Sequence, residues 1–317
     1  MTDRLEIPFG PSSTAVEVLD GVDLSDKAAI VTGASSGIGV ETARALARSG
    51  AAVTLAVRNV AAGEAVAAEI AADRAARTPL VKALDISEPA SVAGFVEGWS
   101  GPCDILVANA GVMAPPETRN SHGWELQFAT NHLGHFQLAN GLHDRQWLSR
   151  GARVVVVSSV GHVNGEVQFA DPNFEHTPYD PWLAYSQSKT ANVLFAVEAA
   201  RRWRSGGVAV NALNPGRIWS TSLSRHMETP PQSFDPSGAT GVTEKTVEQG
   251  AATSVLLAGS PFVEGVTGKY FEDCQEAVPF APGVRRGVAA YALDPDKAAR
   301  LWSLSRDLLA SAGYPVA

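Results

Sequence analysis

Cysteine is scarce in this chain, and long apolar runs are missing. Its 317 residues include two cysteines, Cys103 and Cys274, without metal-type spacing. Such a pair excludes a disulfide framework and a zinc site, and it fits a reducing compartment. No stretch approaches the ~20 apolar residues of a membrane span, and residues 1–10 lack the apolar core of a signal peptide. We therefore expect a cytoplasmic protein with no metal and no membrane partner.

Concentrated basic charge is also missing. The chain has 25 Lys and Arg against 33 Asp and Glu, a formal net charge of −8, and no basic block. Phosphate backbones bind to a concentrated Lys/Arg face, so we expect no nucleic-acid partner. Apolar material is plentiful, because 45% of the residues are hydrophobic and 18% are charged. This is enough for one large globular domain.

Short apolar runs alternate with longer Ala-rich segments of helical period. Helices are predicted between Ile38 and Gly50, over 61–72 and over 191–200. Strands are predicted at residues 28–31, 53–57, 80–84, 105–108, 154–157 and 208–213. Continuous apolar strands separated by helices are typical of a parallel sheet covered on both faces. The predicted fold class is therefore α/β, a Rossmann-type doubly wound parallel sheet with helices on both faces.

We expect a single domain with two extensions. Residues 1–26 form an N-terminal extension, 27–281 the dinucleotide-binding catalytic domain, and 282–317 a C-terminal extension that packs on the same domain.

Two stretches break the alternation of strands and helices. Residues 161–181 are expected to form a loop beside the active site. Residues 222–241 are rich in Ser, Thr, Pro and Gly, and loops of this length in compact domains are either lids or disordered. We expect a mobile substrate loop near 221–245 that acts as a lid.

A glycine-rich turn lies directly between the first predicted strand and the first predicted helix. Glycine lets the backbone turn tightly and approach a pyrophosphate, whose charge is met by the free N–H groups of the helix N-terminus. A tight turn without a ligand is the alternative interpretation. The candidate cofactor-binding residues of this turn are Gly33, Ser35, Ser36, Gly37, Ile38 and Gly39.

The end of the second predicted strand lacks an acidic residue. NAD sites usually place Asp or Glu about 20 residues beyond the glycines, where it accepts from the ribose 2′-hydroxyl. Here the strand ends in Arg58 and Asn59. Arg58 can pair with a 2′-phosphate through its guanidinium fork, although a solvated surface arginine is the alternative. NADP(H) is therefore the favoured cofactor, and NAD(H) is the other candidate.

Further cofactor candidates follow the third, fourth and sixth predicted strands. The carboxyl edge of an α/β sheet is where ligands bind, and an acid there can accept from an adenine amino group. Each position can also be a simple turn residue, so the argument depends on their order along one chain. These candidates are Asp85, Ile86, Asn109, Ala110, Gly111, Pro215, Gly216, Ile218 and Ser220.

Tyr185 and Lys189 are four residues apart at the start of a predicted helix, where they share a face. A carbonyl reduced by hydride needs a proton, and a nearby ammonium lowers the pKa of a tyrosine toward the working range. This spacing is common by chance, so its surroundings matter. Ser159 follows the fifth strand at the same sheet edge. Asn131 lies in a predicted helix that can hold a water behind the lysine.

The order of these motifs resembles the short-chain dehydrogenase/reductase superfamily. Thr-Gly-x-x-x-Gly-x-Gly, Asn-Ala-Gly, Asn, Ser, Tyr-x-x-x-Lys and Pro-Gly occur in that order within residues 27–271. Residues 13–21, 55–59 and 159–192 are more narrowly similar to the retinol dehydrogenase and WW-domain oxidoreductase branch. That branch prefers NADP(H).

The resemblance implies a role for each catalytic candidate. Tyr185 is the acid/base, Ser159 orients the substrate oxygen, Lys189 tunes Tyr185 and binds ribose, and Asn131 supports a water relay. Ser36 departs from the pattern, because some NADP-using relatives carry a basic residue there.

The expected activity is NADP(H)-dependent hydride transfer between a hydrophobic secondary alcohol and a ketone or aldehyde. Trp182 and Trp219 flank the predicted site, either as pocket walls or as core residues. Two other functions remain open: a catalytically silent NADP(H)-binding regulatory protein, and a reductase of C=C bonds.

Two further expectations concern partners and metals. Apolar residues cover most of the helix predicted at 191–200, more than one buried stripe requires. Related enzymes pair this helix with its symmetry mate, so we expect a homodimer or homotetramer. His132 and His135 have a spacing that metals use, but without a third ligand a packing role is expected. Loop packing is also expected for His162.

Overall fold

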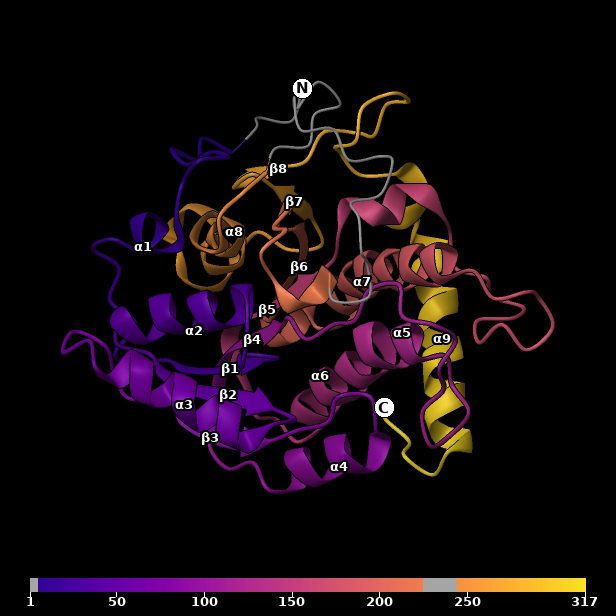
Figure 1. The fold of residues 1–317 in the computed structure, drawn as a ribbon, viewed down its shortest axis with the longest axis horizontal. Coiled ribbons are helices and arrows are strands. Elements are labelled where there is room, and N and C mark those ends of the chain that lie inside the picture. The colour runs from indigo at the N-terminus through magenta and orange to yellow at the C-terminus, as the bar shows by residue number, and fades with distance from the viewer. Residues whose placement is uncertain (1–4, 225–243) are drawn as a thin grey trace.

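A single sheet forms the centre of the computed structural model, which describes residues 5–224 and 244–317. Eight strands follow the order β3-β2-β1-β4-β5-β6-β7-β8 (Figure 1). β1 to β7 pair in parallel, and β8 is antiparallel to β7. The strands are β1 (Ala28–Thr32), β2 (Ala52–Val57), β3 (Leu80–Ala83), β4 (Cys103–Ala108), β5 (Leu148–Val157), β6 (Ala209–Asn214), β7 (Tyr270–Glu272) and β8 (Gln275–Glu276). The predicted doubly wound Rossmann-type sheet is confirmed.

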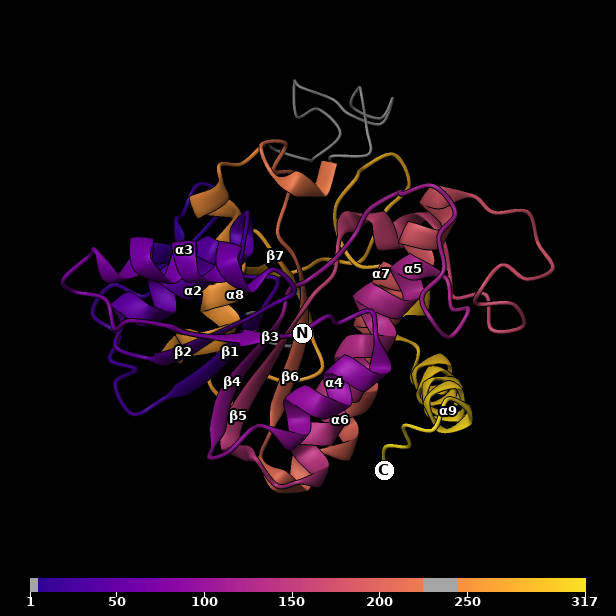
Figure 2. The same cartoon turned by 60° about the horizontal axis from the view of Figure 1, so that its bottom comes forward.

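Helices cover both faces of this sheet (Figure 2). One face carries α1 (Ala15–Val18), α2 (Ile38–Arg48), α3 (Val60–Ala71) and α8 (Val247–Gly259). The other carries α4 (Pro89–Glu97), α5 (Leu126–Phe128), α6 (Gly134–Asp144), α7 (Pro181–Arg202) and α9 (Pro295–Ser311). In β1, Ala29 and Val31 pack toward the first set and Ile30 toward the second, as the two-residue period of a strand requires.

Short helical turns complete the described chain. A π-helical turn, η1 (Ala129–Leu133), joins α5 to α6. The 3₁₀ turns are η2 (Val160–Asn164), η3 (Arg204–Gly206), η4 (Ser222–Ser224), η5 (Pro261–Val263) and η6 (Ala290–Leu293). None of the helices in the described ranges is long and apolar enough to cross a membrane.

The start of α7 is fixed by its capping residues. Asp180 accepts hydrogen bonds from the N–H groups of Trp182 and Leu183, both at 2.8 Å, and Pro181 fills the first helical position. Tyr185 therefore lies in the first turns of the helix. The prediction over 191–200 captured the second half of this helix.

The C-terminal helix α9 packs along α7, at the edge of the molecule in Figure 1. The ring centroid of Trp302 lies 4.9 Å from that of Phe136 and 6.0 Å from that of Phe195. All residues from 191 to 200 are buried except Val197, which is half-buried. The apolar surface from which we expected a homodimer is thus covered within the chain, because a distant segment packs on it.

Two loops were expected near the active site. Residues 225–243, which hold most of the expected lid over 222–241, lie outside the described residues. The loop after η2 is bound by Arg119, which donates to the carbonyls of Asn173 and Phe174 at 2.9 and 3.0 Å. This loop ends at Asp180, directly before α7.

Candidate active site

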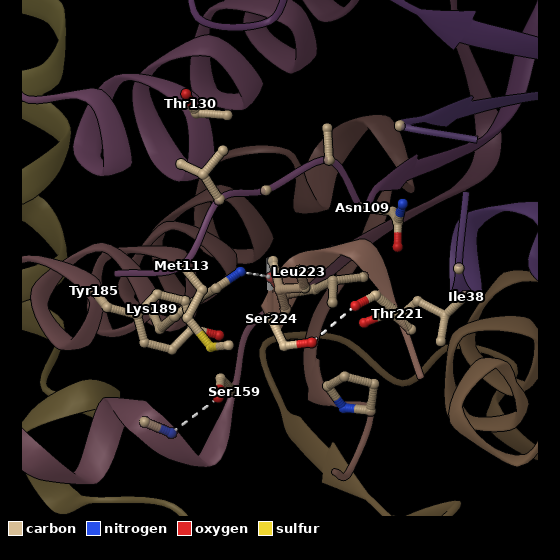
Figure 3. Close-up of a pocket in the computed structure, with 18 of the residues that line it drawn as sticks. Ile38, Asn109, Met113, Thr130, Ser159, Tyr185, Lys189, Thr221, Leu223 and Ser224 are labelled. Atoms are coloured by element: carbon tan, nitrogen blue, oxygen red, sulfur yellow. Dashed lines mark hydrogen bonds between the residues drawn. The ribbon is translucent and has the colours of Figure 1, made fainter. Parts of the chain in front are cut away.

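A cavity of about 1010 Å³ lies at the carboxyl ends of the parallel strands. Figure 3 shows Tyr185, Lys189 and Ser159 at one end and Ile38 with Asn109 at the other. Most of the residues singled out from the sequence line this cavity: Gly33, Ser35, Ser36, Gly37, Ile38, Gly39, Arg58, Asn59, Asp85, Ile86, Asn109, Ala110, Gly111, Ser159, Tyr185, Lys189, Pro215, Gly216 and Ile218.

The glycine turn brings backbone very close to the neighbouring strand end. Gly33 has a φ of +67°, and a Cβ there would lie 2.8 Å from the Cα of Ala110. A Cβ on Gly39 would lie 2.6 Å from Asn109 Nδ2. No side chain caps the start of α2 at Gly37, which leaves its first N–H groups for a ligand. The turn therefore fits the pyrophosphate of a dinucleotide.

The Thr32 hydroxyl joins this turn to the end of β4. Its oxygen accepts from the N–H groups of Asn109 and Ala110 at 2.9 and 3.0 Å and lies 2.8 Å from His135 Nε2. His135 Nδ1 is 3.1 Å from the carbonyl oxygen of Asn131. Because that carbonyl can only accept, Nδ1 carries the proton and Nε2 accepts from Thr32. Burial lowers the pKa of His135 to about 4, which keeps the ring neutral.

The polar residues after β2 and β3 differ in whether their side chains form hydrogen bonds within the described chain. Asn59 accepts an N–H group of α3 and caps that helix. Asp85 accepts from the N–H and hydroxyl of Ser87 at 3.0 and 2.6 Å. Arg58 is exposed, and its guanidinium has no hydrogen bond or ion pair with residues 5–224 or 244–317. It is therefore available to an anionic ligand at this end of the cavity.

The three catalytic candidates meet at the other end. Tyr185 is buried at 5% exposure. The Lys189 ammonium lies 5.7 Å from the centroid of the tyrosine ring and donates to the carbonyl of Val157 at 3.1 Å. Ser159 Oγ accepts from the N–H of Gly161 at 3.0 Å. A phenol, an ammonium and a hydroxyl thus share one wall of the cavity.

Burial controls the protonation of this group. It raises the pKa of Tyr185 to about 12, and hydrogen bonding with Ser159 offsets only part of that rise. It lowers the pKa of Lys189 to about 8. The expectation that Lys189 brings the Tyr185 pKa down toward the working range is not what this geometry gives, because desolvation of the phenolate dominates. At neutral pH Tyr185 is a protonated donor.

Two sequence candidates do not line the cavity. Asn131 donates from Nδ2 to the carbonyl of Val112 and to Ser188 Oγ at 3.0 and 2.9 Å, and its Oδ1 accepts from the N–H of Val112 at 2.9 Å. It supports the cavity wall from behind. Ser220 is exposed, and its neighbour Thr221 lines the cavity instead.

Sequence reasoning missed most of the apolar wall. Met113, Pro115, Leu183 and Leu223 line the cavity beside Trp182 and Trp219, as does a distant arginine, Arg285. These residues come from separate segments without a common motif, so no local pattern marks them.

The other histidines singled out from the sequence are packed side chains. His132 Nε2 lies 2.8 Å from Ser305 Oγ, and burial lowers its pKa to about 3. His162 Nδ1 is 2.7 Å from the carbonyl of Ser159, and its Nε2 accepts from the N–H of Ala289 at 3.2 Å. No group of three or more His, Cys, Asp or Glu that could hold a metal ion is found in the described part of the chain.

Comparison with known proteins identifies the family. Residues 27–231 match the family model described as short chain dehydrogenase. The chain belongs to this family. A probable oxidoreductase of Streptomyces antibioticus is 51% identical and is matched over 92% of this chain and 100% of its own length. Retinol dehydrogenase 12 of Homo sapiens is 40% identical, and the match covers 91% of this chain and 88% of that protein. The WW domain-containing oxidoreductase of Danio rerio is 39% identical, and the match covers 97% of this chain and 74% of that protein.

Solved structures agree with this assignment. An uncharacterized protein from Mycobacterium Paratuberculosis has a TM-score of 0.72 and 35% identity, over 94% of this chain and 97% of its own. The Pseudomonas aeruginosa RhlG/NADP complex has a TM-score of 0.62 and 26% identity, over 78% and 95%. The resemblance inferred from the motifs is confirmed, including its narrower branch, and the protein is an oxidoreductase of this family.

Proposed function

We propose that this protein is an NADP(H)-dependent oxidoreductase that interconverts a hydrophobic secondary alcohol and a ketone, or an aldehyde, with Tyr185 as acid/base. One observation carries the proposal: a single cavity runs from the glycine turn to buried Tyr185 and is walled by apolar side chains. The nicotinamide cofactor, when bound, supplies or accepts the hydride. The protein's own residues handle the proton and the orientation of the substrate.

Each catalytic residue has a distinct task in the reduction direction. Tyr185 donates its hydroxyl proton to the carbonyl oxygen, since burial keeps its pKa at about 12 and the developing alkoxide is a far stronger base. Ser159 Oγ donates a hydrogen bond to the same oxygen and orients it. The Lys189 ammonium, 5.7 Å from the ring, stabilises the tyrosinate that remains. Asn131 keeps the wall at Val112 in place.

The preference for NADP(H) rests on Arg58. No acidic residue ends β2, and the free guanidinium at this end of the cavity matches a 2′-phosphate. The NADP found in RhlG supports the same choice. A cytoplasmic location remains a prediction from the sequence.

The test combines a substrate screen with removal of the proton donor. NADPH oxidation is followed over aldehydes, aryl ketones, steroids and retinoids, and kcat is then compared for the wild type and Tyr185→Phe. Loss of a positioned acid costs about 10²–10⁴-fold in kcat, while NADPH binding stays nearly normal. Tyr314→Phe removes a hydroxyl from a residue that does not line the cavity and serves as the matched control, with unchanged kcat.

Three results would overturn the proposal. A Tyr185→Phe enzyme that keeps more than about a tenth of kcat, about 1.4 kcal/mol of barrier, has another acid. Stoichiometric NADPH binding without turnover of any ketone indicates a regulatory protein. A product reduced at C=C, identified by mass and NMR, indicates the other reductase chemistry.

A further inference from the structure

Arg285 reaches the cavity from far along the chain. It lies in the segment between β8 and η6 and lines the cavity together with Asn164 and Ser159. Arg285 is half-buried as a residue, and its guanidinium makes one long, solvent-exposed hydrogen bond, 3.4 Å from Nη1 to Asn164 Oδ1. Within residues 5–224 and 244–317 no carboxylate forms an ion pair with it. A partly desolvated positive charge thus faces the cavity without a counter-ion in the described chain.

The carboxylates that line the cavity are already engaged. Asp85 accepts from Ser87, and Asp180 accepts from the first two N–H groups of α7. Neither forms an ion pair with Arg285, whose one hydrogen bond within the described residues is to Asn164. Burial also lowers the pKa of Arg285, which reports the free-energy cost of holding this cation away from water. An anion bound beside it would recover that cost.

The backbone on the C-terminal side of Arg285 is firmly held. The N–H of Gly287 donates to Glu272 at 2.8 Å, and the N–H of Ala289 donates to His162 Nε2 at 3.2 Å. Val288 pairs with backbone on both sides of Pro279, at 2.8 and 2.9 Å. The chain is therefore anchored two to four residues after Arg285, which limits the positions that the arginine backbone can take.

The position of Arg285 relative to Ser159 determines which part of a bound ligand can reach the guanidinium. Asn164 lies in η2, the turn that begins directly after Ser159. A Cβ on the next residue, Gly165, would lie 3.0 Å from the Leu183 side chain of α7. Through its bond to Asn164 the guanidinium lies beside η2, at the end of the cavity that holds Ser159.

We propose that Arg285 forms an anion subsite for a substrate carboxylate, so that the substrate class is an oxo acid or hydroxy acid with an apolar spacer. This inference rests on the proposed function. The guanidinium fork matches a carboxylate through two parallel hydrogen bonds, and the apolar residues Met113, Trp182 and Leu223 line the space for the spacer.

The test uses ligand pairs that differ in one charge. 4-Acetylbenzoate is paired with 4-acetylbenzamide, and the longer, flexible 7-oxooctanoate with 7-oxooctanamide. Affinity for the NADP⁺-loaded protein is measured by calorimetry, and kcat/KM is measured with NADPH. In the wild type at least one carboxylate should be preferred to its amide. Arg285→Gln should weaken that carboxylate at least tenfold, about 1.4 kcal/mol, and leave its amide within about twofold.

Two further variants sharpen this experiment. Arg285→Lys keeps the charge without the fork and should retain part of the preference. Arg300→Gln removes an exposed arginine of α9 that does not line the cavity. This variant should change neither the affinity for the carboxylate nor the affinity for its amide.

The subsite and the proposed function can fail separately. The subsite is overturned if neither carboxylate is preferred in the wild type, or if Arg285→Gln weakens carboxylate and amide equally. Ketone turnover without any charge preference leaves the proposed function standing alone. Carboxylate binding that depends on Arg285, without turnover of any ketone, leaves the subsite standing alone.

Discussion

Lys189 is the residue whose charge should set the pH dependence of turnover. Burial holds its pKa at about 8, below the ordinary lysine range, so the ammonium is present below about pH 8 and lost as pH rises through it. Tyr185 keeps its proton over the same range because its pKa is about 12. We predict that kcat for ketone reduction is flat from about pH 6 to about pH 8 and then falls. The measurement is kcat at saturating NADPH and ketone.

An independent signal separates the two titrations. Tyrosinate absorbs in the ultraviolet, so the difference between wild type and Tyr185→Phe reports the ionisation of Tyr185. That difference should stay absent through the falling limb of the rate profile. If it develops together with the limb, Tyr185 and not Lys189 titrates there, and the assignment to Lys189 is incorrect.

Arg58 should determine the choice between the two dinucleotides. Arg58→Asp replaces a phosphate partner with a repelling charge, so NADPH binding should weaken much more than NADH binding. The ratio of kcat/KM for NADPH to that for NADH should fall at least tenfold. Arg74→Asp, in the exposed turn after α3, is the matched control because Arg74 does not line the cavity. An unchanged ratio in Arg58→Asp would show that Arg58 does not recognise the phosphate.

At the residue level the sequence predicted those positions that stand in local motifs. The glycine turn and the Tyr185 and Lys189 pair line the cavity as expected, because strand ends converge at one edge of the sheet. Arg285 could not be found this way, because its position depends on how a distant segment packs. The high pKa of Tyr185 was also out of reach, since burial is a property of the whole fold.

Among the elements, α7 shows why apolar periodicity in the sequence predicts that a helix exists better than it predicts where the helix begins and ends. Its first half carries Ser186, Gln187, Ser188 and Thr190, all buried, so apolar periodicity is absent there. These side chains are buried because the backbone and other polar groups satisfy them; Thr190, for example, donates to the carbonyl of Gly165. The β7–β8 turn was missed because Asp273 and Cys274 take positive φ without glycine.

The contact between α7 and α9 should contribute strongly to stability. Trp302 is 3% exposed, contacts the rings of Phe136, Phe195 and Trp203, and lies under the guanidinium of Arg202 at 4.6 Å. Trp302→Ala should lower the free energy of unfolding by about 3–5 kcal/mol, because a large cavity opens at the interface. Urea denaturation measures this loss.

The neighbouring Ser303→Ala provides the control on the same helix. Ser303 is exposed and bonds only within α9, so its removal should change the free energy of unfolding by no more than about 0.5 kcal/mol. If Trp302→Ala lowers the free energy of unfolding by no more than Ser303→Ala is expected to, α9 contributes little to the core.

At the scale of the whole molecule, the packing of α9 changes the argument about assembly. The apolar residues at 191–200 are buried within one chain, so a homodimer or homotetramer would need another surface or a displaced α9. Homo-oligomerisation therefore stays a prediction without its original basis. The sequence could not reveal this, because a helix that packs on α7 from the C-terminus and one from a second copy would leave the same apolar pattern.

Three buried histidines should make the whole fold sensitive to mild acid. Burial lowers the pKa of His132 to about 3 and those of His135 and His162 to about 4. The unfolded chain takes up these protons near pH 6.5, whereas the folded chain takes them up only near pH 3–4. Stability present above about pH 6.5 is therefore lost as pH falls. Between about pH 7.5 and 5.5 each histidine should remove about 1.3 kcal/mol from the free energy of unfolding.

Buried carboxylates act in the opposite direction, so the histidine contribution is isolated with a variant. Burial raises the pKa of Glu125 and Glu272, and such groups gain protons in the folded state first. We compare urea unfolding at the two pH values in wild type and in His132→Gln, whose pH dependence should be smaller by about 1.3 kcal/mol. His176→Gln, at an exposed position, should behave as wild type. If His132→Gln shows the full wild-type dependence, the pKa of His132 in the folded protein is close to its unfolded value, and burial does not shift it.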